Sequence, residues 1–210
     1  MKSKLRRLTL RDRLPRHASW EVLSLPRSVF KVVVLGAGGV GKTSLIQRFV
    51  MDDFPRYYTP TVEDIYEKTV SINKDFGAFF EILDTAGSYQ FPAMRRLTIG
   101  RGDAFILVYS LSDDNSIEEV LRLRQEIIDI KGTSEVPVVI VGNKTDLVTK
   151  DKREKVRRKL SCLVGGENLI RSETSAKFAI NVNGVFQALL GQIAVVSNER
   201  IRRISSSMTI

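Results

Sequence analysis

Residues 36–44 of this chain, GAGGVGKTS, place several glycines close to a lysine and a threonine. Glycines let backbone N–H groups curl around a phosphate where side chains would obstruct them. The positively charged Lys42 side chain can bind the oxygens of the outer phosphates, and the Thr43 hydroxyl is a suitable oxygen ligand for Mg²⁺. The spacing matches G-x-x-x-x-G-K-[ST], so we predict a phosphate-binding loop rather than a glycine-rich turn with a chance GKT. The expected contacts of this loop are Gly38, Gly39, Val40, Gly41, Lys42, Thr43 and Ser44.

A second polar group, DTAGS at residues 84–88, comes directly after an apolar run. Beside a phosphate loop, Asp84 is suited to hold Mg²⁺ through water, and Gly87 lets its N–H approach a terminal phosphate. An aspartate at the end of a strand is more often a cap or turn residue. This assignment therefore depends on the other motifs.

Residues 143–146, NKTD, can identify the base of a nucleotide. The Asp146 carboxylate can accept hydrogen bonds from both N1–H and N2–H₂ of guanine, whereas adenine presents an acceptor at N1. We expect Asn143 to tie the loops together and contact the base edge, and the Lys144 stem to cover one face of the ring. In the later TSAK segment, we expect the Ala176 backbone N–H to donate to guanine O6. The four motifs in this order favour a guanine site over the alternative of an adenine-specific NTPase.

Strands and helices must bring these motifs together. Apolar or alternating runs predict strands, and a period of 3.6 residues predicts helices. Expected strands cover residues 30–35, 65–72, 79–83, 104–111, 136–141 and 169–173, and expected helices cover 45–50, 117–128, 150–159 and 182–193. This alternation predicts an α/β fold with a six-stranded, mainly parallel sheet and helices on both faces. The motifs then lie at the carboxyl ends of strands, where such sheets bind ligands.

Composition and charge divide the chain into one domain and two tails. The length of 210 residues and the hydrophobic content of 43% fit a single domain, expected at residues 29–196. Residues 1–28 contain eight basic and two acidic residues, for a net charge of +6, and residues 197–210 have a net charge of +2. The nearly neutral domain argues against nucleic-acid binding. The basic tails are either solvated spacers or contacts for an anionic membrane surface.

The N-terminal segment leaves three interpretations open: a short amphipathic membrane helix, a disordered basic tail, or a mitochondrial targeting segment. The sequence contains neither an apolar run of the roughly 20 residues that span a membrane nor a secretory signal. We therefore expect a cytoplasmic protein, with peripheral attachment to the cytoplasmic face of the plasma membrane as an option. Cys162, the only cysteine of the sequence, is expected to be a buried small residue.

Taken together, GAGGVGKTS, YYTPTVEDIY, ILDTAG, VGNKTD and ETSAK resemble the motifs of the Ras family of small GTPases. The resemblance covers residues 29–196, and SYQFPAMRRL and EEVLRLRQEIIDIKG are most similar to the Di-Ras and Dexras/Rhes branches. It implies a monomeric signalling switch that binds GTP and GDP with Mg²⁺ and hydrolyses GTP slowly. It also implies an exchange factor, an activating protein, and effector proteins that bind the GTP state.

The resemblance also implies roles that the motifs alone do not assign. Thr61 would contact Mg²⁺ and the γ-phosphate, Phe54 would lie against the guanine, and GTP would order residues 54–66 and 84–100. Further nucleotide contacts would be Tyr58, Ser175 and Lys177. The Mg²⁺ ligands would be Thr43, Thr61 and Asp84, and the groups that act in hydrolysis would be Lys42, Thr61, Gly87 and Ser88. The effector surface would consist of Val62, Glu63, Asp64 and Tyr66.

Two features depart from the family pattern. Ser88 stands where the family usually has a glutamine that orients the attacking water, and serine is shorter and has no amide. The sequence ends Ser207, Met208, Thr209, Ile210 and begins with Lys2 after Met1, so we expect neither prenylation nor myristoylation at these ends. Two interpretations remain: a weak GTPase that needs an activating protein, or a constitutively GTP-loaded scaffold with negligible hydrolysis.

Overall fold

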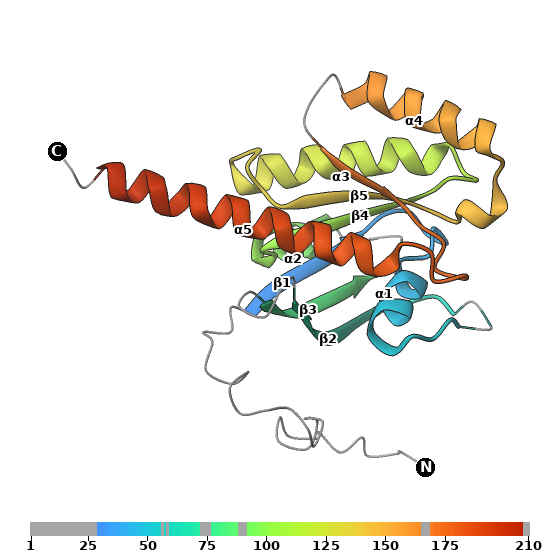
Figure 1. The fold of residues 1–210 in the computed structure, drawn as a ribbon, viewed down its shortest axis with the longest axis horizontal. Coiled ribbons are helices and arrows are strands. Elements are labelled where there is room, and N and C mark those ends of the chain that lie inside the picture. The colour runs from blue at the N-terminus through green and yellow to red at the C-terminus, as the bar shows by residue number, and fades with distance from the viewer. Residues whose placement is uncertain are drawn as a thin grey trace, which may run out of the picture.

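A mixed β-sheet with helices on both faces forms the body of the molecule (Figure 1). The computed structural model describes residues 29–55, 57, 59–71, 77–87, 92–164 and 169–207. Within these residues, the sheet has six strands in the spatial order β2-β3-β1-β4-β5-β6. The pair β2 and β3 is antiparallel, and the other neighbouring pairs are parallel. The strands are β1 Val29–Leu35, β2 Glu63–Ser71, β3 Gly77–Thr85, β4 Ala104–Ser110, β5 Val138–Asn143 and β6 Ile170–Glu173.

The central strands are covered on both faces. β4 (AFILVYS) and β5 (VVIVGN) are buried along their whole length, as continuous apolar runs in a parallel sheet require. In β1, Val32 and Val34 contribute to one core, whereas Val33 and Leu35 contribute to the other, because successive side chains point to opposite faces. The parallel strands therefore end at one common edge, and the polar motifs follow at that edge.

Helices α1 and α5 pack on one face of the sheet, and α2, α3 and α4 pack on the other. On the first face, the rings of Phe49 in α1 and Phe186 in α5 stack with their centroids 3.5 Å apart. On the second face, Ile99 of α2, Ile117 of α3 and Leu160 of α4 share one core. The helices are α1 Lys42–Met51, α2 Pro92–Arg101, α3 Asn115–Lys131, α4 Lys150–Val164 and α5 Val182–Ser207, and a 3-10 helix, η3, spans Thr145–Leu147.

The expected fold class is confirmed, although several boundaries differ. The sequence periodicity did not predict α2, and its apolar residues Met94 and Leu97 are exposed. α4 continues beyond residue 159 to Val164. α5 continues as a helix through Ser207, so residues 197–207, expected to be a separate tail, prolong the last helix away from the sheet (Figure 1). Residues 1–28, with their three alternative interpretations, lie outside the described residues.

The expectation that Cys162 is buried is wrong, because its side chain is exposed. Helix α4 buries Val156 and Leu160, which lie four residues apart on one face. Cys162 follows Leu160 by two residues, and two steps of about 100° each place it on the opposite face. Within the described ranges, every helix is too short or too polar to span a bilayer.

Candidate functional site

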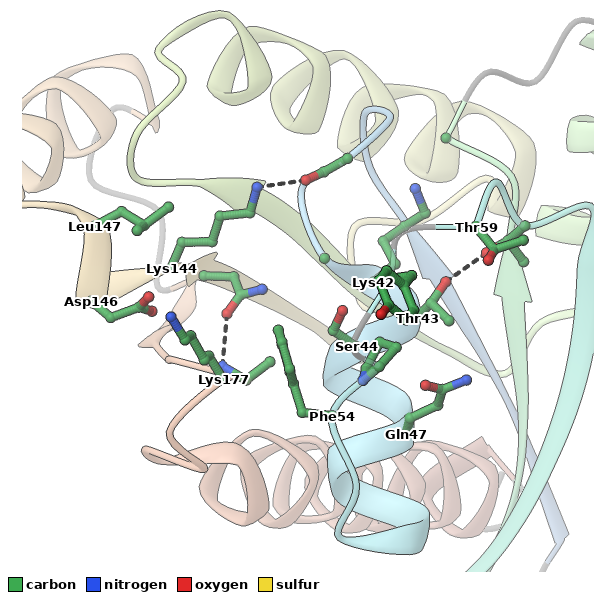
Figure 2. A pocket seen from close by; sticks show the side chains of 18 of the residues that line it. Lys42, Thr43, Ser44, Gln47, Phe54, Thr59, Lys144, Asp146, Leu147 and Lys177 are labelled. Carbon is green, nitrogen blue, oxygen red and sulfur yellow. Dashed lines mark hydrogen bonds between the residues drawn. The ribbon is translucent and has the colours of Figure 1, made fainter.

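A cavity of about 510 Å³ opens at the edge where the parallel strands end (Figure 2). The loop between β1 and α1 forms its floor, and the segments that follow α1, β3, β5 and β6 form its walls. The four sequence motifs, distant along the chain, therefore line one cavity. Its lining includes Gly39, Gly41, Lys42, Thr43, Ser44, Phe54, Thr61, Gly87, Asn143, Lys144, Asp146, Ala176 and Lys177.

The loop at residues 36–41 needs glycine at specific positions. Gly36, Gly39 and Gly41 have φ values of 146°, 71° and 97°, in the region that L side chains rarely adopt. A Cβ at Gly36 would also collide with the Val108 carbonyl, and one at Gly41 would collide with the Asn143 amide. Gly41 precedes the first residue of α1, so the loop leads directly into a helix N-terminus, which favours anions.

Gly87 packs directly on this loop. A Cβ at Gly87 would collide with the backbone of Gly38. Glycine therefore brings the chain after β3 against the phosphate loop, where we predicted that the Gly87 N–H meets a terminal phosphate.

The Lys42 side chain lies folded within the loop. Its exposed fraction is 5%, and its Nζ donates hydrogen bonds to the carbonyl oxygens of Gly36 at 2.9 Å and Ala37 at 3.0 Å. Burial lowers the pKa of the Lys42 ammonium from 10.5 to about 8, and the neighbouring Asp84 carboxylate offsets part of this shift. An incoming polyphosphate would restore the solvation that burial has removed from this cation.

Three oxygen-bearing side chains lie together beside Lys42. The Thr43 and Thr61 hydroxyls are 2.6 Å apart, although 18 residues separate them in sequence. Both carboxylate oxygens of Asp84 are buried without a hydrogen-bond partner. Burial raises the pKa of Asp84, and Asp64 adds to this, whereas the nearby Thr43 hydroxyl and Lys42 lower it. Thr43 is thus close enough to Asp84 to lower the pKa of its carboxyl, although the two side chains do not meet the geometry of a hydrogen bond.

This oxygen group fits Mg²⁺. Neighbouring ligands of an octahedral ion with bonds of 2.0–2.1 Å lie about 3 Å apart, a spacing that the two threonine hydroxyls reach with a shift of a few tenths of an ångström. A buried carboxylate without a partner is costly unless a cation compensates it. The residues predicted to hold the ion are therefore suitable, with Asp84 inside β3 rather than at a cap.

Asn143 joins three parts of the site. Its amide nitrogen donates to the Val40 carbonyl at 3.0 Å. Its Oδ1 accepts from the Thr174 hydroxyl at 3.1 Å and from the Ala176 backbone N–H at 3.2 Å. The Ala176 N–H lines the cavity and is directed at Asn143, so guanine O6 would share or replace that acceptor, and the expected contact with O6 stays a prediction.

Lys144 and Asp146 of the NKTD segment also line the cavity. Asp146 Oδ1 accepts a hydrogen bond from the Ser175 hydroxyl at 2.6 Å, which orients the carboxylate. Lys144 has a φ of 67°, and its Nζ donates to the Gly39 carbonyl at 2.7 Å, so its stem runs along the cavity. Figure 2 shows Lys144 and Phe54 on different sides of the space that Asp146 faces.

Arg48 was not predicted and supports the base side of the cavity. Its guanidinium donates to the carbonyl oxygens of Ala176 at 3.1 Å and Lys177 at 3.3 Å. It thereby fastens the TSAK segment to α1. The sequence does show a charged residue among the apolar positions of α1, which could have indicated a specific contact. It does not show the partner, because Ala176 lies 128 residues away.

The remaining predicted residues fall into three groups. Ser88 and Tyr58 lie outside the described residues. Val62, Glu63 and Asp64 are exposed at the start of β2, as an effector surface requires. Tyr66 differs, because it is half-buried against the core and its hydroxyl accepts a hydrogen bond from Gln47 of α1 at 3.3 Å.

Comparison with known proteins agrees with this geometry. The sequence profile of the Ras family matches residues 31–195. GTP-binding protein Di-Ras2 of Pongo abelii and GTP-binding protein Di-Ras1 of Homo sapiens are each 45% identical to the chain over 162 residues, which are 77% of this chain and 80% of the relative. GTP-binding protein drn-1 of Caenorhabditis elegans is 40% identical over 177 residues, 81% of this chain and 78% of the relative. The chain therefore belongs to the Ras family of small GTPases and is similar to Di-Ras proteins.

Proposed function

We propose that this protein is a signalling switch that binds GTP and GDP with Mg²⁺, hydrolyses GTP slowly and engages effectors in the GTP state. One observation carries the proposal. A single cavity joins a phosphate loop, an oxygen group suited to Mg²⁺ and the Asp146 carboxylate. Only a ligand with phosphates at one end and a base with paired donors at the other would use all three.

Each part of the cavity has a distinct role in this proposal. The loop amides and Lys42 bind the phosphates, while Thr43, Thr61 and Asp84 would hold Mg²⁺, which when bound neutralises charge on the phosphate oxygens. Asp146, kept in place by Ser175, selects guanine. Asn143 and Arg48 position the loops that carry these groups.

Hydrolysis is proposed to be slow and to depend on an activating protein. Ras-type domains hydrolyse GTP at only about 10⁻⁴ s⁻¹ without help, and Ser88 lacks the amide that orients water in those domains. The second candidate is a constitutively GTP-loaded scaffold, which the same serine favours. In both cases, we propose a monomer without affinity for nucleic acid, with an exchange factor and effectors as partners.

The nucleotide bound to freshly purified protein distinguishes the two candidates. Mostly GDP supports a working switch, and mostly GTP supports the scaffold. A single-turnover assay of Ser88→Gln beside the parent chain tests the role of the side chain, and we expect the variant to hydrolyse GTP faster. Fast GTP hydrolysis by the parent chain, or an unchanged rate in the variant, would contradict the role assigned to Ser88.

A further inference from the structure

The C-terminal turn of α4 carries an exposed serine among arginines. The Ser161 hydroxyl accepts a hydrogen bond from the Arg171 guanidinium of β6 at 2.7 Å. Arg157 and Arg158 precede Ser161 by four and three residues, so they lie on the same side of the helix. All four side chains are exposed. The proposed nucleotide site uses none of them.

We propose that Ser161 is a phosphorylation site for protein kinases that recognise basic residues before the target serine. Arg158 and Lys159 occupy the third and second positions before Ser161, and Arg157 adds a further charge. In the reaction, the Ser161 oxygen forms a bond to the γ-phosphorus of ATP, the bond from that phosphorus to the β,γ-bridging oxygen breaks, and ADP leaves. The hydroxyl proton passes to the catalytic carboxylate of the kinase and then to solvent.

The surrounding arginines can bind the phosphate by donating hydrogen bonds to it. A phosphoserine carries a charge close to −2 and three strong acceptor oxygens, which match the forked donors of arginine. The C-terminal end of α4 repels the phosphate, but its partial charge is only about −0.5. Arg157, Arg158 and Arg171 carry three positive charges that attract the phosphate. Glu154 pairs with Arg157 at 3.2 Å and with Arg158 at 3.1 Å, so the phosphate must compete with this carboxylate, but its charge close to −2 is the larger.

Access to a kinase requires the last turn of α4 to open. Ser161, Cys162 and Leu163 are exposed and α4 ends at Val164, but Leu160 is buried next to the target. Helix ends open locally at much lower cost than the whole domain. We therefore expect phosphorylation of the folded protein to be complete but slower than for an unstructured substrate.

Phosphate at Ser161 would also change the contacts of the guanine loop. Arg157 pairs with Glu173 at 2.9 Å, whereas Arg153 reaches the same carboxylate only at 3.6 Å. Glu173 is the last residue of β6 and directly precedes the segment in which Ser175 holds Asp146. A dianion at Ser161 competes for Arg157, weakens the hold on Glu173 and loosens the base loop. This second half of the inference rests on the proposed guanine-nucleotide function, whereas the modification itself does not.

The first experiment treats the full chain with a basophilic kinase and ATP and locates phosphate by mass spectrometry. The Ser205→Ala variant serves as the background, because RRIS at residues 202–205 offers another basic target, and phosphate on the RRLT segments at residues 6–9 and 95–98 is located and counted separately. We expect about one phosphate per chain at Ser161, none in the additional Ser161→Ala variant, and at least tenfold slower incorporation with Arg158→Ala. Lys155→Ala, an exposed charge six residues from Ser161, is the matched control and should react like the background. Absence of phosphate at Ser161, or equal rates for the Arg158 and Lys155 variants, would overturn the site.

The second experiment measures release of a fluorescent GDP analogue before and after modification. We expect release to be about threefold or more faster after phosphorylation. Arg157→Ala should accelerate release without phosphate, and phosphorylation of that variant should then add little. Stoichiometric phosphate at Ser161 with unchanged release would disprove the coupling while leaving the site intact. Failure of the chain to bind GDP at all would instead count against the proposed function.

Discussion

At the scale of single residues, base selection depends on Asp146. Changing Asp146 to Asn replaces a charged acceptor by an amide that faces the donors of guanine, and it should cost a few kcal/mol of affinity for GTP, roughly 100-fold. Xanthosine triphosphate should bind better to the variant, because its C2 oxygen accepts a hydrogen bond. Competition binding measures both effects, with Asp151→Asn on α4 as the matched control. A variant that binds GTP as tightly as the parent would refute the base site.

Lys42 links nucleotide binding to pH. Its pKa of about 8 in the free protein should rise when phosphates surround the ammonium. Nucleotide binding is therefore accompanied by uptake of a proton. The affinity for nucleotide is highest well below pH 8 and falls as the pH rises through that value. Titration calorimetry in two buffers of different ionisation enthalpy should give an uptake of about half a proton at pH 8 and about a tenth at pH 7. Equal uptake at both pH values would mean that another group titrates.

At the scale of elements, β2 is the exposed edge of the sheet. Among the described residues it pairs with β3 alone, so its outer backbone groups can receive a strand from a partner. Glu63 and Asp64 at its start would select a basic partner. The double change Glu63→Lys and Asp64→Lys should abolish capture of GTP-dependent partners and change nucleotide affinity far less, because neither side chain lines the cavity. Asp129→Lys with Asp151→Lys makes the same charge change elsewhere, and equal capture by both double variants would move the effector surface away from β2.

At the scale of the whole molecule, the net positive charge is concentrated in the two ends of the sequence. Residues 1–28 and 197–210 have net charges of +6 and +2. Each basic residue near an anionic surface contributes up to about 1 kcal/mol, and salt at about 0.5 M screens this attraction. We expect vesicles of anionic lipid to sediment the full chain at low salt and to release it at high salt.

The two tails should contribute unequally to that binding. Removal of residues 1–28 should release far more protein than Ser205→Glu, since the first segment has the larger charge. A variant in which the eight basic residues of this segment are changed to glutamine keeps its length but removes its positive charge. It therefore distinguishes the effect of charge from the effect of length. If the parent chain stays in solution with anionic vesicles at low salt, the tails are spacers without membrane function.

The sequence by itself determined the fold class and the family, and it predicted the motifs that meet in one cavity. Apolar runs such as those of β4 and β5 predict buried parallel strands, because only strands covered on both faces can be apolar throughout. The phosphate loop and Asp146 were identifiable because phosphate and guanine each demand particular chemical groups at short range. Local patterns of this kind need no knowledge of distant contacts.

Only the tertiary structure decided which distant groups meet. Arg48 braces the loop at Ala176, Asp84 lies buried beside Thr43, and Tyr66 turns toward α1. Cys162 is exposed because the core contacts of Val156 and Leu160 set the rotation of α4. These facts depend on how helices pack against the sheet, and that packing joins residues whose separation in sequence carries no local signal.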